Sequence, residues 1–434
     1  MSTYKPSKAP WLARIPSTWS EAPLFTFFRD NKTKNIGMAE ANVLSLSYGT
    51  IKRRDLDSGM GLLPESFETY QIVEPGDIVL RLTDLQNDQR SLRTGLVRER
   101  GIVTSAYLAL RPSKYVDPRF AHYLLHSLDT MKVYYGLGAG VRQTMKYRDL
   151  SGAYLAMPMR VVQTQIADYL DSEIARIDAL IDRKQRFIDL LLEKRTAIIA
   201  HAVTKGFDYK AEMKDSGIEW FGAIPLHWTV GRLKDLVTSI QTGPFGTQLG
   251  ANDYMVDGTP VINPVHIKDN RLVPDPETSV TEATVARLNG YLLRTADVVC
   301  ARRGDLGRCA VVTPQQEGWV TGTGSLRVRP NQRRVAPEFL QLLISQQGSR
   351  DWLSLQSVGA TMDNLNEGIL ARLPVAAPDV VEQRSIIRRI GADVCKVDDL
   401  VERTRRSIDL LREYRTALIS AAVTGQIDIP GTET

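Results

Sequence analysis

The sequence has few of the residues that build disulfide frameworks, metal sites and membrane helices. It contains 3 cysteines and 5 histidines among 434 residues. A sparse, odd number of cysteines excludes a disulfide framework and is typical of a reducing compartment. No apolar run approaches the ~18–20 residues of a membrane helix, and the first residues lack the apolar stretch of a secretory signal. We therefore expect a cytoplasmic protein that does not enter a membrane.

Motifs of catalysis and cofactor binding are also missing from the sequence. There is no phosphate-binding G-x-x-x-x-G-K-[ST] loop, and the isolated glycine cluster at 136–141 does not join a strand to a helix as dinucleotide-binding loops do. His122 and His126 are four residues apart, but no third metal ligand accompanies them. The Asn-Pro-Pro-aromatic signature of adenine methyltransferases is absent as well. We expect no metal, no cofactor and no catalytic activity in this chain.

The composition is that of an ordinary globular protein, with 43% hydrophobic and 24% charged residues. A chain of this length predicts two or more domains, since one domain usually takes ~100–200 residues. The net charge is +5, and the excess of positive charge lies in residues 1–160, which contain 22 Lys and Arg against 15 Asp and Glu. This bias is compatible with nucleic acid as a partner and equally compatible with an ordinary solvated surface.

The chain contains an internal repeat. The 32 residues that begin at Glu173 match those that begin at Asp393 without gaps, 220 positions later. Near the start of each half, WLARIPSTW from Trp11 matches WFGAIPLHW from Trp220, 209 positions later. Between these anchors the resemblance is faint, as in EPGDIVLR from Glu74 and RTADVVCA from Arg294. The pattern indicates a tandem duplication whose ends remained similar while the middles diverged.

The two matched segments are predicted to be long helices with a coiled-coil seam. Their apolar residues recur at spacings of three and four, and arginine interrupts both stripes at matched positions. The seam positions are Ile174, Ile177, Ile181, Ile188, Leu191 and Arg195 in the first copy, and Val394, Val397, Val401, Ile408, Leu411 and Arg415 in the second. The matched polar breaks favour packing of one helix on the other, because such breaks set register. Two amphipathic helices packed on their own domains are the alternative.

The order globule, helix, globule, helix predicts an α+β protein with two mixed α/β domains separated by two long antiparallel coiled-coil helices, related by an internal pseudo-two-fold repeat. The predicted boundaries are 1–160 for the first globular domain, 161–204 for the first helix, 205–378 for the second domain with a connector, and 379–434 for the second helix and tail. Alternating apolar residues near Asn42, Gly76 and Val298 predict strands. One helix is expected to begin near Pro118 and to run through RFAHYLLHSLDTMKVYYG from Arg119. Another is expected to run through PEFLQLLISQQGSRDWL from Pro337.

These residues resemble the specificity subunit of type I restriction–modification systems. The resemblance covers essentially the whole chain. It depends on the repeated W-x4-P-x2-W motif, on the repeated helix ends EKRTAIIAHAVTKG and EYRTALISAAVTG, and on TGPFGTQLGANDYMVDGTPVINPVHIKDNRL from Thr242. A Pro-x4-Gln motif also precedes each helix, at Pro158 and Pro378. The family usually has Glu-Gln there, as in Glu382-Gln383, whereas the first copy has Val162-Gln163.

The resemblance implies a non-catalytic, sequence-specific DNA-binding subunit. Each globular domain would be a target-recognition domain that reads one part of a bipartite double-stranded DNA target. The helices would form a conserved spacer that sets the distance between the half-sites and docks two methylation subunits, which restriction subunits would join. S-adenosylmethionine would bind the methylation subunits, and ATP with Mg the restriction subunits. The alternative is a two-headed coiled-coil protein scaffold that does not contact DNA.

Candidate DNA-binding residues are the amides, cations and other polar side chains in loops of the two globular domains. Arginine suits guanine edges, and asparagine or glutamine suits adenine, because each can make two hydrogen bonds to the base. For any single residue, a phosphate contact or a structural role is an equal alternative. The candidates are Arg81, Asp84, Gln86, Asn87, Arg90, Arg142, Gln143 and Lys146 in the first domain, and Gln248, Asn263, His266, Lys268, Arg302, Arg303 and Asn364 in the second.

Overall fold

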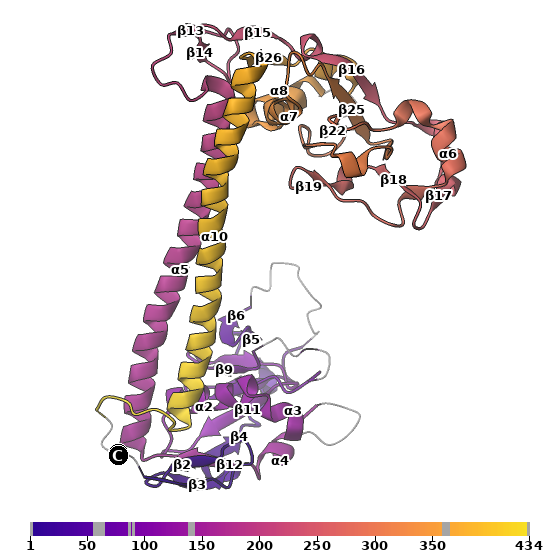
Figure 1. Ribbon diagram of the computed structural model, residues 1–434. Coiled ribbons are helices and arrows are strands. Elements are labelled where there is room, and N and C mark those ends of the chain that lie inside the picture. The colour runs from indigo at the N-terminus through magenta and orange to yellow at the C-terminus, as the bar shows by residue number, and fades with distance from the viewer. Residues whose placement is uncertain are drawn as a thin grey trace. The chain divides into compact units, whose positions relative to one another are not determined.

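The computed structural model describes residues 3–54, 66–85, 88, 92–137, 144–357 and 365–431. The chain divides into two compact units. The first unit comprises Met1–Arg186 with Thr404–Thr434, and the second comprises Phe187–Arg403. Each unit therefore contains one globular domain and a part of both long helices (Figure 1). None of the helices in the described part of the chain is long and apolar enough to cross a membrane.

The first unit is built around a four-stranded antiparallel sheet in the order β4-β11-β8-β9. Its strands and short helices are β1 (Tyr4–Pro6), β2 (Arg14–Pro16), β3 (Ser20–Pro23), α1 (Leu24–Phe27), β4 (Phe28–Asp30), β5 (Leu44–Ser47), β6 (Thr50–Arg53), β7 (Gln71–Val73), β8 (Ile78–Leu80), β9 (Thr94–Leu96), β10 (Gly101–Val103), β11 (Leu108–Pro112), α2 (Pro118–Thr130), α3 (Val133–Leu137), α4 (Tyr147–Leu150) and β12 (Tyr154–Met157). The fully buried strand β8 and the apolar face of α2 share one core cluster.

The second unit repeats this sheet as β16-β25-β22-β23. Its elements are β13 (Met213–Asp215), β14 (Ala223–Pro225), β15 (Thr229–Arg232), β16 (Val237–Thr242), β17 (Tyr254–Met255), β18 (Thr259–Ile262), β19 (Ile267–Lys268), β20 (Arg271–Leu272), β21 (Ser279–Val280), α6 (Glu282–Arg287), β22 (Val298–Ala301), β23 (Cys309–Val311), β24 (Val320–Thr321), β25 (Ser325–Pro330), α7 (Pro337–Ser345), α8 (Gln347–Ser357), α9 (Glu367–Ala371) and β26 (Pro374–Ala377). The duplication therefore includes the middles of the two halves, where the sequences diverged.

An ion pair between an arginine and a buried carboxylate recurs at the same place in both sheets. Arg111 donates from Nε and Nη2 to the two carboxylate oxygens of Asp77 at 2.8 and 2.7 Å. Arg329 donates to Asp297 in the same way, at 2.8 and 2.7 Å. Each carboxylate also accepts a backbone N–H from the residue three positions earlier. The weak sequence similarity between EPGDIVLR and RTADVVCA therefore reflects a shared, bidentate carboxylate–guanidinium contact.

The connector expected at the start of the second domain contains a strand of the repeat. Met213 in β13 pairs with Pro225 in β14, as Tyr4 in β1 pairs with Pro16 in β2. Both members of the second pair lie 209 positions after those of the first. The segment before Trp220 is therefore part of the repeated structure and contributes one strand, β13, to a two-stranded sheet.

The two predicted spacer helices are α5 (Arg160–Lys205) and α10 (Val380–Val423). In each unit a part of α5 lies beside a part of α10 (Figure 1). Seam residues are largely withdrawn from solvent, with Ile174, Ile177, Ile188, Leu191, Val397, Val401 and Ile408 buried and Ile181, Val394 and Leu411 half-buried. The fold class is the predicted one: α+β, with two mixed domains, two long antiparallel helices and an internal repeat.

Contacts inside each unit show the antiparallel direction. In the first unit, Gln165 near the start of α5 contacts Gly431, which follows α10. Asp178, further along α5, contacts Arg415, which comes earlier in the chain than Gly431. In the second unit Arg195 contacts Asp398. A Cβ added at Gly206, just beyond α5, would lie 3.4 Å from Glu382 near the start of α10.

Each long helix is fastened to its domain by the glutamine of the Pro-x4-Gln motif. Gln163 accepts the backbone N–H of Asp117 at 2.8 Å and donates to the carbonyls of Tyr115 and Pro158. Gln383 accepts from Ala336 at 2.8 Å and donates to the carbonyls of Arg334 and Pro378. The two amides are 1% and 0% exposed, so each saturates buried backbone groups that would otherwise lack partners.

Two helices predicted from the sequence are interrupted in the structure. The helix that begins at Pro118 ends at Thr130, and α3 follows after Lys132, whose φ of 62° is left-handed. Asp117 caps its start by accepting N–H bonds from Arg119 and Phe120. The helix that begins at Pro337 is divided into α7 and α8 at Gln346, whose ψ of 152° is extended.

Candidate nucleic-acid interface

Two loops that the sequence singled out in each half are brought together by one backbone hydrogen bond. In the first unit, the loop between β8 and β9 meets the segment before α4 where Met145 donates to the Leu82 carbonyl at 2.9 Å. In the second unit, the loop between β22 and β23 meets the segment before α9 where Leu365 donates to the Arg302 carbonyl at 2.9 Å. Both residues of the second bond lie 220 positions after those of the first. The two units thus present the same pair of loops.

Arg93 organises the first of these loops from inside. Its side chain is fully buried, directly before β9. The guanidinium donates to the carbonyls of Arg81 at 3.0 Å, Thr83 at 2.7 Å and Asp84 at 3.2 Å, and also to that of Asp88. A buried cation with several carbonyl partners stabilises the backbone at the residues it contacts, because losing any partner would leave charge unsatisfied.

Arg93 was not among the residues selected from the sequence. The available signal was its match with Arg308, since each arginine immediately precedes the fourth strand of its sheet. The Nε of Arg308 is buried and has no hydrogen-bond partner. The second loop is also shorter, so the two loops are not held in the same way.

Three first-domain candidates lie on this pair of loops within the described residues. Arg81 is half-buried next to β8, whereas Asp84 and Lys146 are exposed. Asp84 has a left-handed φ of 57°, which an aspartate tolerates better than most residues. The candidates outside the described residues are Gln86, Asn87, Arg90, Arg142 and Gln143.

Arg302 and Arg303 occupy the equivalent place in the second unit. Arg302 donates from Nε to the Leu365 carbonyl at 3.0 Å, so its guanidinium helps to hold the two loops together. Burial, together with the neighbouring Arg303, lowers the pKa of Arg302 from its usual value. Arg303 itself is exposed. Asn364 lies outside the described residues.

The remaining second-domain candidates lie elsewhere in the unit, and one of them is internal. His266 is 4% exposed, with Nδ1 3.0 Å from the Val261 carbonyl and 3.1 Å from the Asn263 nitrogen. Burial lowers the pKa of His266. The ring closes a turn and is buried, and base reading by His266 stays a prediction. The sequence could not distinguish this structural histidine from an exposed one.

Gln248, Asn263 and Lys268 differ in how far they are available to a ligand. Gln248 is exposed, but its side-chain oxygen accepts from the Tyr291 hydroxyl at 3.0 Å. Asn263 is half-buried against Gly322, where an added Cβ would lie 2.3 Å from its Oδ1. Lys268 is exposed on the β19–β20 hairpin.

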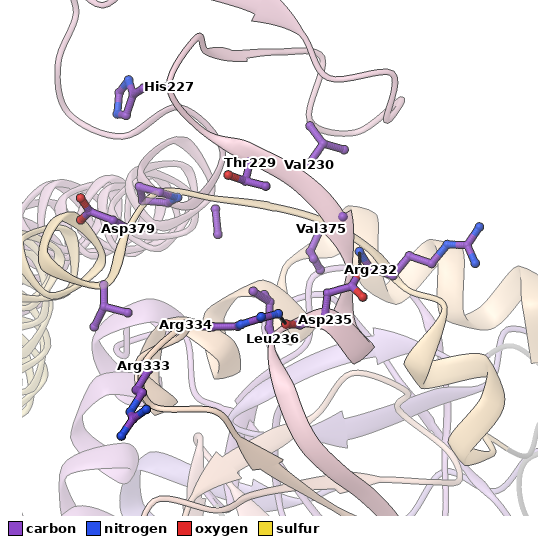
Figure 2. A pocket seen from close by; sticks show the side chains of 14 residues that line it. His227, Thr229, Val230, Arg232, Asp235, Leu236, Arg333, Arg334, Val375 and Asp379 are labelled. Atoms are coloured by element: carbon purple, nitrogen blue, oxygen red, sulfur yellow. Dashed lines mark hydrogen bonds between the residues drawn. The ribbon is translucent and has the colours of Figure 1, made fainter.

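The second unit contains a cavity of about 530 Å³ where β15 and β26 meet the start of α10 (Figure 2). Arginines and two carboxylates line it, and both carboxylates accept hydrogen bonds from backbone N–H groups. Asp235 accepts the Arg232 N–H at 2.9 Å, and Asp379 caps α10 by accepting from Glu382 at 2.9 Å. Among the described residues no group of three or more His, Cys, Asp or Glu could hold a metal ion. The cavity is a structural junction between the domain and its helix.

The arginines of the seam pair with carboxylates on the facing helix. Arg195 Nε lies 3.0 Å from Asp398 Oδ1, and Arg415 Nε lies 3.3 Å from Asp178 Oδ1. Asp178 and Asp398 are themselves equivalent positions of the repeat.

Comparison with known proteins agrees with this architecture. The family described as the type I restriction modification DNA specificity domain matches residues 225–394. The specificity subunit of the Escherichia coli type I restriction enzyme EcoBI is 22% identical over 288 residues, which are 64% of this chain and 60% of that protein. Residues 225–394 therefore resemble a type I DNA specificity domain, and the chain is similar to type I specificity subunits. It spans about 60% of the length of this relative.

Solved structures of type I specificity subunits share the fold of this chain. The HsdS subunit from Thermoanaerobacter tengcongensis superposes with a TM-score of 0.56 and covers 95% of this chain and 98% of its own, at 14% identity. A chain from a study of complex assembly and conformational transition of the type I R-M system gives a TM-score of 0.68, covering 95% and 99%, also at 14% identity. At this identity the similarity establishes the fold of the specificity subunit.

Proposed function

We propose that this chain is the non-catalytic, sequence-specific DNA-binding subunit of a type I restriction–modification complex, and that each unit reads one part of a bipartite double-stranded target. The observation that carries the proposal is the repeated pair of loops. The same backbone bond joins the loops in both units, while their side chains differ. A common scaffold with different loop side chains suits two readers of two different half-sites, because base edges are distinguished by side-chain donors and acceptors.

The partners we propose are two methylation subunits, joined by restriction subunits. This proposal is supported by a set of exposed leucines at equivalent positions of the long helices. Leu180 and Leu400 are 42% and 43% exposed, and Leu190 and Leu410 are 61% and 65% exposed. Each pair is separated by 220 positions. A repeated apolar surface of this kind suits two copies of one partner.

The proposed complex would carry its cofactors on the partner subunits. S-adenosylmethionine would serve the methylation subunits, and ATP with Mg the restriction subunits, in the cytoplasm. The helices of this chain would set the spacing of the half-sites. Its own residues would bind DNA and hold the partners in place.

Selection from a random duplex library tests DNA recognition. The full chain, co-purified with its methylation subunit, is incubated with the library, and the bound fraction is sequenced. Enrichment of two short motifs at a fixed separation is expected. Binding of DNA without an enriched motif would favour a protein scaffold. So would a complex with the methylation subunit that forms but binds no DNA.

Paired substitutions on the helices test the docking surface. Leu190→Glu with Leu410→Glu should abolish co-elution with the methylation subunit, because two charges would enter an apolar interface. Thr196→Glu with Thr416→Glu is the matched control, since these exposed residues are also 220 positions apart. Loss of assembly in both double variants would point to general disruption of the helices.

A further inference from the structure

The tip of the β5–β6 hairpin carries an exposed tyrosine. Ser47 pairs with Thr50, so only Tyr48 and Gly49 form the turn. Both have left-handed backbones, with φ of 46° and 78°. Tyr48 is 82% exposed, so its ring adds nothing to the core of the unit.

A tyrosine is a poor choice for this turn on conformational grounds. Two-residue hairpin turns with positive φ at both positions favour Asn-Gly and Asp-Gly, because a bulky side chain is strained there. The second unit has an equivalent hairpin, β19–β20, whose tip is Asp269 and Asn270 with φ of 48° and 60°. That tip uses residues suited to the backbone. Strain that persists at an exposed position points to a role outside folding.

The two hairpins occupy the same place in their units. In the first, a Cβ added at Gly95 of β9 would lie 2.6 Å from Leu46 and 2.9 Å from Ile51. The hairpin therefore packs on the edge strand of the four-stranded sheet. In the second, Ile267 and Leu272 share a core cluster with Ala310 of the corresponding strand β23.

The turn lies beside the loop between β8 and β9. A Cβ added at Gly49 would lie 3.2 Å from Leu92 Cβ and 3.7 Å from the Thr94 carbonyl. These residues flank Arg93, which holds the loop between β8 and β9. Lys52, on the same hairpin, is exposed and adds positive charge. The ring of Tyr48 is thus carried on a two-residue turn next to the loop that we propose reads DNA.

We propose that Tyr48 contacts bases of the half-site read by the first unit. This inference rests on the proposed DNA-binding function. An exposed aromatic ring on a two-residue turn offers a flat apolar surface of the kind that packs against a thymine methyl group or against a partly unstacked base step. The second unit, with Asp269 and Asn270 at its tip, has no such ring there.

The decisive variant is Tyr48→Asn, which creates the Asn-Gly turn that this backbone prefers. Binding of the full chain with its methylation subunit is measured by fluorescence polarisation on the duplex that the wild type selects from the random library. We expect roughly tenfold weaker binding, a melting temperature equal to or above that of the wild type, and relaxed selection at the first half-site alone. Tyr48→Phe should bind like the wild type, because it keeps the ring.

Tyr115→Asn is the matched control, since Tyr115 is 68% exposed in the same unit. It should bind DNA normally. Wild-type affinity of Tyr48→Asn on a duplex selected by the wild type would overturn the role of Tyr48 and leave DNA recognition standing. A lower melting temperature of Tyr48→Asn would overturn the argument from strain. A wild-type complex that selects no motif would overturn this inference together with the proposed function.

Discussion

Arg195 donates from Nε to Asp398 Oδ1 across the two long helices at 3.0 Å. The equivalent residues of the other copy, Asp178 and Arg415, form the reciprocal pair at 3.3 Å in the other unit. All four side chains are between 36% and 52% exposed. The pairs therefore contribute little to stability, and their value lies in specifying which positions of the helices face each other.

A double-mutant cycle on Arg195→Ala and Asp398→Ala should give a coupling energy of about 0.2–1 kcal/mol, as exposed ion pairs do. The coupling should decrease in ~1 M salt, where screening is effective over a few ångströms. Urea unfolding of the four proteins measures both. The pair Asp399–Arg403, which lies within α10, is the control for charges that do not join the helices. A coupling above ~2 kcal/mol would show that the pair is a major source of stability.

Gln383→Ala should destabilise the second unit by about 2–4 kcal/mol, because it leaves the Ala336 N–H and two carbonyls unsatisfied in a buried place. Gln163→Ala should act similarly in the first unit, where the contacts are equivalent. Gln165→Ala is the control, because its one hydrogen bond is exposed. Chemical denaturation measures the change. Equal stability of the Gln383 variant and this control would contradict the fastening role.

The first unit should lose stability in mild acid because of His122 and His126. Burial lowers the pKa of each to about 4, and for His126 the charge of Arg415 adds to the effect. The unfolded chain, with an ordinary histidine pKa near 6.5, therefore takes up protons first. The contribution is fully present above about pH 6.5 and disappears towards pH 4.

From pH 7.5 to pH 5 the free energy of unfolding should fall by about 2 kcal/mol for each of these histidines. Denaturant titrations at the two pH values measure the loss. His126→Gln should lose less stability over this interval than the wild type, whereas His201→Gln, in the second unit, should lose as much. An identical loss in the His126 variant and the wild type would contradict the assignment.

The sequence was sufficient to predict the repeat and the two long helices. Periodic apolar residues report burial directly, so Ile177 and Val397 were recognised as seam positions. The inward positions of Arg93 and His266 could not be predicted, for one reason. Both are polar residues in loops, and only tertiary contacts show that their side chains are turned inward. The breaks at Lys132 and Gln346 were missed because a single backbone angle ends each helix while the apolar pattern continues.

If each unit recognises its own half-site, replacing residues 20–155 with the same region of a relative should change one half of the selected motif. The other half and the separation should stay constant, because the second unit and both helices are untouched. Sequencing of selected duplexes measures this. A change in both halves would contradict independent recognition.

If α5 and α10 set the spacing, inserting one heptad into both helices should lengthen each by roughly 10 Å. The preferred separation of the half-motifs should grow by a few base pairs. Inserting a heptad into α5 alone is the control, and it should impair assembly because the paired positions no longer match. An unchanged separation in an active double insertion would mean that another feature measures the DNA.

The contacts of Arg93 have a consequence for how such a protein changes its target. The guanidinium is bonded to the main-chain oxygens of Arg81, Thr83 and Asp84, which every amino acid possesses. Substitutions at Thr83 or Asp84 can therefore alter the side chain offered to a ligand without removing these backbone hydrogen bonds. Because these hydrogen bonds do not depend on the loop side chains, the scaffold is kept when a side chain changes. If the loop reads DNA as proposed, single mutations can therefore be tolerated while a different sequence preference is acquired.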